Sequence, residues 1–535
     1  MSQDEVERIL PGWQAASDGV AHELAEWRVA HPKATLSEIE DAVFEAMQKL
    51  QARALGEVVQ ASSATDVAAQ PPDERPRCPT CGGRLEPRGR QRRTVRPARQ
   101  RAPLDLDRSY AVCATCGAGL FPLDEELGLL PGELSVTLAQ GVARLGTKMP
   151  FAQAVADLAF FWNVDLDETT VRRYTQAAGA AYVAEQAAEL EQLERERPPV
   201  ADKPAVQYLS ADGAMVPLVG GEWAEVKTLA IGSVELRPGK DGLPNAQTSE
   251  LTYFSRLADA ETFIRHAYVE THRRGTEVAK VVCAVQDGAE WLQGLVDVLR
   301  PDAVRILDFP HALEHVSASA QPVFGIGTLQ FTAWLDEQAH TLKHSADGAR
   351  QVLAAMAKLP VHLGVDPTAA ADARDHALTY FTKRLAQVQY AAFHAAGYPI
   401  GSGSTESANK LVVEARLKGS GMHWARANVD PLVALRTVAC ANRWDEVWPR
   451  ISARLRVMAE QRRRARWRTR HSKPTPIAVA SPPSTITATQ PGPTATPTEG
   501  RNKSVVNGRP TPLHPWKRFG YGRLPHGRHD LRFPR

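Results

Sequence analysis

The pattern of hydrophobic and polar residues predicts helices in the first part of the chain. Residues 1–70 read as helical, because residues 37–47 carry apolar side chains at intervals of three and four. Helical periodicity returns between residues 134 and 192 and ends at Pro198-Pro199, since proline disfavours a continuing helix. Between these stretches, residues 78–116 are rich in Gly and Arg and contain only short strand-like fragments.

After Pro204 the pattern becomes that of an α/β region. Residues 260–273 and 290–299 predict helices between apolar runs, and residues 320–395, rich in Ala and Leu, predict a helical insertion. Glu406 to Lys418 predicts a closing helix. Three strands followed by helix, strand, helix and strand is the order of an RNase H-like core. The runs that predict the strands are 206–211, 223–235, 251–256, 280–285 and 303–307.

Composition predicts a soluble protein with local basic clusters. The 535 residues carry a net charge of +3, and 43% are hydrophobic. Arginines dominate residues 84–101 and 462–470, and such clusters attract phosphates whatever the overall balance. No apolar run has the length of a membrane span, and the acidic first residues lack a signal-peptide pattern. We expect a cytoplasmic, nucleoid-associated protein with no membrane partner.

Four cysteines form two matching Cys-x-x-Cys-Gly motifs, Cys78/Cys81 and Cys113/Cys116. Tetrahedral zinc takes four thiolates, and each motif supplies two from one tight turn. The alternatives are disulfides, which a reducing cytoplasm disfavours, and unconnected buried thiols, which the duplicated spacing disfavours. We therefore predict a structural Zn²⁺ in a zinc ribbon at residues 75–122.

Two segments before the α/β region predict DNA contacts. Arginines between the cysteine pairs, among them Arg92 and Arg93, are candidates for phosphate contacts, with a solvated loop as the alternative. Within residues 125–195, a helix at 150–162 and a second one that opens at Thr169 are separated by a short turn, as in a helix-turn-helix. Arg172 and Arg173 would then read DNA, whereas most helix pairs of this spacing are simply packed together.

Three acidic residues are candidates for a metal site. Asp212 and Asp287 end strand-like runs, and Glu406 opens the closing helix. Singly, each has a simpler interpretation: a hairpin turn for Asp212-Gly213, a capping box for Asp287 with Glu290, and a favourable helix-dipole position for Glu406. Together they have the order and element types of an RNase H-like site for two divalent cations, and the helical insertion explains the long gap before Glu406.

A fourth segment, Asp308-Phe-Pro-His311, follows the last predicted strand. Asp308 is either the N-cap of the next helix or a reserve candidate for the middle acid in place of Asp287. His311 is a candidate for orienting a catalytic carboxylate or for contacting the scissile phosphate.

Taken together, these segments resemble bacterial insertion-sequence transposases of the ISKra type and, more distantly, Mutator-type transposases. The resemblance spans residues 78–448 and rests on Asp212-Gly-Ala, Asp287-Gly-Ala-Glu-Trp, Asp308-Phe-Pro-His and the segment 401–410, Gly-Ser-Gly-Ser-Thr-Glu-Ser-Ala-Asn-Lys. The segment 416–424 also matches, except that His423 stands where Arg is expected before Trp, which puts a local DNA contact in doubt.

The resemblance implies a DDE-type transposase that cleaves DNA and transfers strands at the ends of an insertion sequence. In such families the acidic triad, here Asp212, Asp287 and Glu406, binds two Mg²⁺ (or Mn²⁺). The expected partners are double-stranded DNA, as terminal inverted repeats and target, and further copies of the chain. The alternatives are an RNase H-like DNA nuclease and a catalytically inactive, transposase-derived DNA-binding protein. The cations Lys410, Arg416 and Lys418 are expected near the DNA, with Trp424 as a stacking platform or a core residue.

The expected fold class is therefore multidomain α/β, an RNase H-like core preceded by a zinc ribbon and a candidate helix-turn-helix. The expected domains are a helical region (1–70), the zinc ribbon (75–122), a helical region with the candidate helix-turn-helix (125–195), the DDE catalytic domain (204–455) with an all-helical insertion at about 320–395, and a basic, then disordered tail (456–535).

Overall fold

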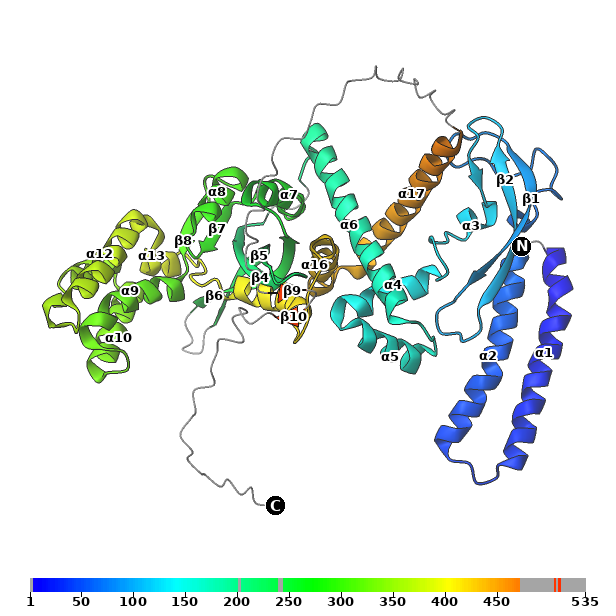
Figure 1. Cartoon of the computed structure of the whole chain (residues 1–535), viewed down its shortest axis with the longest axis horizontal. Coiled ribbons are helices and arrows are strands. Elements are labelled where there is room, and N and C mark those ends of the chain that lie inside the picture. The colour runs from blue at the N-terminus through cyan, green and yellow to red at the C-terminus, as the bar shows by residue number, and fades with distance from the viewer. Residues whose placement is uncertain (1–2, 201–203, 239–243, 472–504, 507–508, 511–535) are drawn as a thin grey trace, which may run out of the picture. The chain divides into compact units, whose positions relative to one another are not determined.

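A five-stranded mixed sheet organises the middle of the chain (Figure 1). The computed structural model describes residues 3–200, 204–238, 244–471, 505–506 and 509–510. The strands are β4 (Val206–Pro217), β5 (Trp223–Pro238), β6 (Pro244–Arg256), β7 (Val281–Gln286) and β8 (Val304–Leu307). Their order is β6-β5-β4-β7-β8; β4, β7 and β8 pair in parallel, and β5 runs antiparallel to both of its neighbours.

Helices cover both faces of this sheet. On one face, α7 (Ala260–Arg273) and α8 (Glu290–Leu299) contribute Phe263 and Leu292 to a core with Leu229 and Phe254. On the other face, α6 (Glu168–Glu196) and α16 (Arg426–Cys440) pack in a core that contains Tyr208. Strands that are buried on both faces need almost continuous apolar sequence, which β7 has. The predicted mixed α/β class is confirmed.

The segment between β8 and the closing helix is entirely helical, as the sequence predicted, although it begins earlier. Helix α9 already starts at residue 309, directly after β8, and the packing of α12 on α9 holds the insertion together. The helices are α9 (Phe309–Phe324), α10 (Leu329–His344), α11 (Gly348–Ala357), α12 (Pro367–Lys383) and α13 (Tyr390–Ala395), with 3₁₀ turns at Val361–Leu363 and Leu385–Gln387.

The predicted closing helix is interrupted. It begins as α14 (Gly403–Ala408), widens into a π-helical turn (Asn409–Glu414) and ends as α15 (Ala415–Leu417). A π turn inserts one residue per turn and changes which side chains face the sheet, and such turns are frequent at functional sites. Here it begins at Asn409, three residues after Glu406.

Residues before the sheet form the expected helices and a small second sheet. Helix α2 is fixed at its start by a capping box between Thr35 and Glu38. The small sheet contains the paired cysteines and has the order β1-β2-β3. The elements are α1 (Gln3–Ala30), α2 (Leu36–Gln60), a 3₁₀ turn (Ser63–Thr65), β1 (Leu85–Val95), β2 (Leu104–Cys113), β3 (Gly119–Leu120), α3 (Pro122–Glu126), α4 (Val136–Lys148) and α5 (Phe151–Trp162).

The last helix of the first unit corrects the predicted start of the tail. Helix α17 runs from Trp444 to His471, so residues 456–471 continue a helix and are not part of a tail. The chain divides into a unit of residues 1–471 and a unit of residues 472–535. In the second unit, β9 (Val505–Val506) pairs antiparallel with β10 (Arg509–Pro510), and the other residues predicted to be disordered lie outside the described part.

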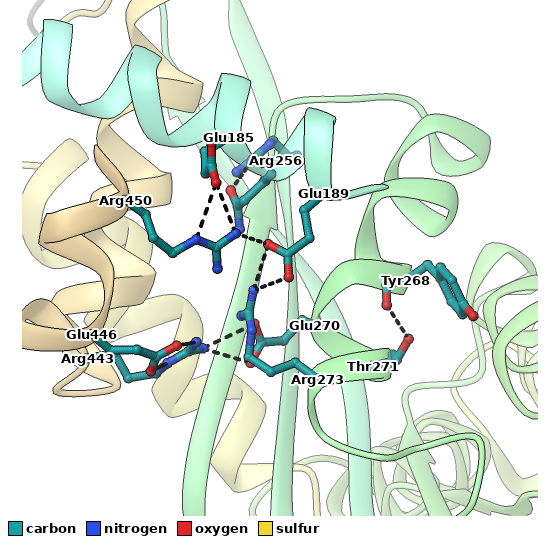
Figure 2. A network of polar contacts seen from close by, with 11 residues as sticks. Glu185, Glu189, Arg256, Tyr268, Glu270, Thr271, Arg273, Arg443, Glu446 and Arg450 are labelled. Atoms are coloured by element: carbon teal, nitrogen blue, oxygen red, sulfur yellow. Dashed lines mark hydrogen bonds and ion pairs between the residues drawn. The ribbon is translucent and has the colours of Figure 1, made fainter. Parts of the chain in front are cut away.

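A network of ion pairs joins α6, α7 and α17 (Figure 2). Glu270 on α7 is 1% exposed and contacts both Arg273 and Arg443. Arg273 also pairs with Glu189 on α6, and Glu189 accepts a hydrogen bond from Arg450 on α17 at 2.6 Å. Buried charges are tolerated only when they are paired and hydrogen-bonded, so the network fixes how these three helices pack.

Candidate catalytic and metal sites

The four paired cysteines form the best-defined metal site among the described residues. Their sulfur atoms all lie within 4.8 Å of one another. No other group of three or more His, Cys, Asp or Glu side chains among the described residues is as compact. Four thiolates at this distance can hold a structural metal such as zinc. The predicted pairing of the two motifs in one site is therefore confirmed at the level of geometry.

The two cysteine turns have the same backbone geometry. In each, the first cysteine donates from its N–H to a carbonyl five residues on, Cys78 to Gly83 and Cys113 to Ala118, both at 2.9 Å. Gly82 and Gly117 have φ angles of +71° and +69°, which only glycine adopts without strain. Backbone hydrogen bonds from Cys116 and Thr115 lower the pKa of Cys113 to about 6, which favours the thiolate that a metal binds. A backbone hydrogen bond from Gly83 acts in the same direction on Cys81, but side-chain hydrogen bonds with Cys113 and Cys116 raise the pKa of Cys81 to about 12.

Asp212 lies within the central strand and not in a turn. It faces Thr228 of β5 in the β4–β5 register, and β4 continues to Pro217. The hairpin-turn interpretation of Asp212-Gly213 is therefore wrong, as is the prediction that the strand ends there. Its Oδ1 accepts from the Gly213 N–H at 2.6 Å, and its Oδ2 accepts from Asn409 Nδ2 at 2.8 Å.

The three predicted acids come near one another around Asp212. Burial raises the pKa of Asp212 first of all, and the negative charges of Asp287 and Glu406 raise it further. The hydrogen bonds from Gly213 and Asn409 oppose this rise. Their carboxylate oxygens are not as closely grouped as the four sulfur atoms, since no such acidic cluster is found within the described residues. The structure thus brings the three acids into electrostatic contact without a tight cage.

Asp287 sits in a loop that the helical insertion holds from outside. Its Oδ1 accepts from the Ala289 N–H at 2.9 Å, and α8 is capped by Ala289 without a side-chain bond, so the capping-box interpretation with Glu290 is wrong. Tyr380 donates to the Asp287 carbonyl at 2.8 Å, and Arg384 donates to the Gly288 carbonyl at 2.7 Å.

Glycine is required at position 288 for this contact. A Cβ there would lie 2.4 Å from the Tyr380 hydroxyl oxygen, and its φ is +86°. Tyr380 of the insertion therefore contacts the backbone beside Asp287 so closely that any side chain at position 288 would clash with it.

Glu406 is exposed, whereas the residues before it are anchored on the sheet. Thr405 shares a hydrogen bond with Tyr208 of β4 at 3.0 Å, and Ser404 shares one with Thr248 of β6 at 2.6 Å. Sequence reasoning missed this role of the hydroxyl residues in Gly-Ser-Gly-Ser-Thr, although their density before an acidic residue was the available signal. Lys410 is exposed and makes no ion pair with Glu406.

Asp308 is the N-cap of α9, which is one of the two roles that the sequence allows for it. It is 3% exposed, and it caps α9 by accepting from the His311 N–H at 2.9 Å. Its other oxygen accepts from the Ser402 N–H at 2.5 Å, which ties the start of α9 to the loop before Glu406. Both oxygens are thus occupied by backbone donors. His311 pairs with Glu314 at 3.3 Å, and no hydrogen bond joins its ring to Asp212, Asp287 or Glu406.

Several predicted DNA contacts face the protein interior. Arg416 is 2% exposed and lies between the rings of Phe151 and Trp424, with its Nε donating to the Gly146 carbonyl at 3.1 Å. Trp424 is 8% exposed and donates to the Leu417 carbonyl. Neither side chain is available to DNA in this structure, so the core interpretation of Trp424 holds and the expectation for Arg416 is wrong.

The remaining predicted contacts divide into free and bound cations. Arg93 donates to Asp124 and to two carbonyls and is 16% exposed, so it is a structural residue of the ribbon. Lys418 pairs with Glu414 at 2.6 Å. Arg92 and Arg172 are exposed, and Arg173 makes only a loose pair with Glu133 at 3.7 Å.

The helices of the candidate helix-turn-helix are present as predicted. Helix α5 ends at Asn163, which adopts a left-handed conformation with φ +52°, and α6 begins after Asp167, which accepts from the Thr170 N–H at 2.8 Å. Arg172 lies in the first turns of α6 with its side chain exposed. This arrangement is compatible both with DNA reading and with simple helix packing.

Comparison with models of known protein families finds no match, and comparison with curated proteins finds none either. No described helix is both long and apolar enough to cross a membrane.

Proposed function

We propose that the chain is a DDE-type DNA transposase whose catalytic acids are Asp212, Asp287 and Glu406. The observation that carries this proposal is the convergence of acids from distant segments on Asp212, a half-buried carboxylate of the central strand whose pKa is raised by burial and by the charges of Asp287 and Glu406. Structural ion networks place acids next to bases, whereas this group places acids next to acids, as sites for divalent cations do.

The sheet supports an RNase H-like catalytic core. Its order β6-β5-β4-β7-β8, with only β5 antiparallel to its neighbours, agrees with three strands in succession followed by two helix–strand units. The acids come from the central strand, from the loop after its parallel neighbour β7, and from the helix that packs on β4. The zinc ribbon and the α5–α6 pair would bind the ends of the element.

The residues present fit divalent cations. Asp212, Asp287 and Glu406 would hold Mg²⁺ or Mn²⁺, which supply a Lewis acid for the scissile phosphate and a nucleophile at neutral pH. The Oδ1 of Asn409, whose Nδ2 binds Asp212, is buried without a partner, so another oxygen stands beside the acids. The hydrogen bond from Asn409 lowers the pKa of Asp212 and so favours its ionised form, against burial and the neighbouring acids. Lys410, exposed one residue on, can contact a phosphate of the bound strand.

Cleavage and joining of the flanking DNA test this function. The substrate is a supercoiled plasmid that carries the DNA flanking the coding frame on both sides, incubated with Mg²⁺. We expect end cleavage and joined strand-transfer products from the natural chain, and a loss of at least 100-fold with Asp212→Asn, Asp287→Asn or Glu406→Gln. The matched control is Glu290→Gln, an exposed acid three residues after Asp287.

Each result has a distinct meaning. Cleavage without joined products supports an RNase H-like nuclease in place of a transposase. DNA binding without cleavage supports an inactive, transposase-derived regulator. Full activity of any one of the three acid variants removes that residue from the triad.

A further inference from the structure

A cavity of about 420 Å³ lies between α4 and α5, next to the turn that joins β1 and β2. Its volume is within the usual range of roughly 300–1,000 Å³ for small-ligand sites. None of the residues that line it belongs to the acidic triad or the cysteine site. The cavity is therefore distinct from both of these sites.

Cations outnumber acids in the lining of the cavity. Arg144 and Lys148 stand one turn apart on α4, and Arg99 reaches in from the β1–β2 turn, whereas Asp157 is the one acid in the lining. Arg144 pairs with the exposed Asp445 only at 4.0 Å and lies 5.8 Å from the ring centre of Trp444, and Lys148 has no ion pair in the described part of the chain. An excess of cations around a cavity attracts an anion, and phosphate is the anion that such sets of Arg and Lys favour.

Aromatic rings complete the lining. Gly141 allows Trp162 to lie directly against α4, because a Cβ at residue 141 would come within 2.3 Å of the indole. The Arg99 guanidinium lies 5.7 Å from the Trp162 ring centre and covers it. Phe161, also in the lining, is 70% exposed, and its neighbour Phe160 is 79% exposed. Large exposed rings at a helix end are unfavourable in water unless a partner covers them.

We propose that this cavity binds an unpaired nucleotide of a DNA strand. The phosphate lies against Arg144 and Lys148, and the base stacks on Phe161. Cations that follow a backbone beside an exposed aromatic platform are the pattern of single-strand binding, in which each base offers a face for stacking. A duplex keeps its bases stacked inside and has no use for Phe161, and an acidic peptide would use the cations alone.

The proposal rests on DNA being the substrate, and it deepens the proposed function by adding a site for the frayed or cleaved end. Fluorescence anisotropy without Mg²⁺ measures it, with a labelled 12-nucleotide oligothymidine and a duplex of the same length as probes. We expect the natural chain to prefer the single strand. Phe161→Ala should weaken single-strand binding about tenfold, since one stacked base is worth roughly 1–3 kcal/mol.

Charge reversal provides the second arm. Arg144→Glu with Lys148→Glu should weaken single-strand binding at least tenfold, whereas the matched double reversal Arg350→Glu with Lys358→Glu, at exposed positions in and just after α11, should leave it unchanged. Equal affinity for duplex and single strand overturns the proposal. An unchanged affinity in Phe161→Ala, or displacement of the strand by polyglutamate at equal charge, overturns it as well.

The triad variants separate this site from the catalytic proposal. Asp212→Asn, which lacks cleavage under the proposed function, should bind the single strand with the affinity of the natural chain. Cleavage that survives in Asp212→Asn counts against the triad alone. A natural chain that cleaves but does not prefer the single strand counts against the cavity alone.

Discussion

Asp212 must hold its charge in a setting that opposes it. Burial and two neighbouring acids raise its pKa, and the amide of Asn409 is the one side-chain donor that acts against them. Asn409 faces Asp212 from the π-helical turn, which begins at this residue. The sequence shows only an Asn three residues after Glu406, with no local sign of a partner almost 200 positions earlier in the chain.

Loss of the Asn409 amide should move the acid limb of the activity profile to higher pH. Under the proposed function, activity needs ionised Asp212, so activity should fall as the pH falls through the pKa of this group. Without the hydrogen bond from Asn409, the pKa of Asp212 rises further. We expect an upward shift in Asn409→Ala, a larger one in Asn409→Asp and none in Ser407→Ala. The pH dependence of cleavage at saturating Mg²⁺ measures it, and an unshifted Asn409→Asp profile would contradict this role.

We expect substitution of Asp308 to lower stability and substitution of Asp287 to lower activity. Asp308 receives two backbone N–H groups and is buried, so Asp308→Ala leaves two donors unpaired at a cost of about 1–3 kcal/mol each. We expect a clear fall in thermal unfolding temperature, with cleavage retained well below it. Asp287→Asn should show the reverse, with near-natural stability and no cleavage. If Asp308→Asn, which keeps the shape, abolishes cleavage without loss of stability, Asp308 is the middle acid.

At the scale of elements, we expect the contact between the helical insertion and the Asp287 loop to weaken at acidic pH. His315 on α9 stacks on Tyr380 of α12, with ring centres 3.7 Å apart. Burial, then the charges of His311, His376 and Arg384, lower the pKa of His315 to about 4. A histidine with a lowered folded pKa contributes stability above about pH 6.5, its unfolded value, and loses it as the pH falls toward 4.

The expected result is faster amide exchange around Gly288 and in α12 as the pH drops from 6.5 to 4, after correction for intrinsic exchange. His315→Phe keeps the stacking and removes the titration, so it should flatten this dependence. His362→Phe, a histidine on the 3₁₀ turn of the insertion, is the control. An acid response of His315→Phe equal to that of the natural chain would assign the effect to other groups.

Local pattern and long-range partners explain what the sequence could predict. Helices α7 and α8 match the predicted bounds residue for residue, because amphipathic spacing is a local property. The cysteine site followed from duplicated spacing. Arg416 and Arg93 were misplaced, because an arginine stacked between two rings or bound to Asp124 looks like any exposed arginine in sequence. The extent of α17 was missed because its basic second half lacks apolar periodicity.

At the scale of the molecule, we expect metal at the cysteine site to reduce local unfolding of α17. Thr80, between Cys78 and Cys81, donates to Glu460 at 3.0 Å and accepts from Arg464 at 2.9 Å. We expect about one zinc per chain, less than half of it in Cys116→Ser and all of it in Cys283→Ala. Chelation should raise amide exchange at residues 456–464 and leave α7 unchanged. Full zinc content in Cys116→Ser would show that this site is not the one that binds it.

The ion network in Figure 2 should decide whether α6, α7 and α17 unfold as one body. Glu270 is buried between Arg273 and Arg443, so Glu270→Gln leaves two cations without their shared anion, at a cost of about 3–5 kcal/mol. Glu446 pairs with the same Arg443 but is 53% exposed, and Glu446→Gln should cost less than about 1 kcal/mol. Urea unfolding measures both, and amide exchange shows whether α6 and α17 then open before the sheet. Equal losses in the free energy of unfolding would mean that the buried Glu270 contributes no more to the packing of these helices than the exposed Glu446.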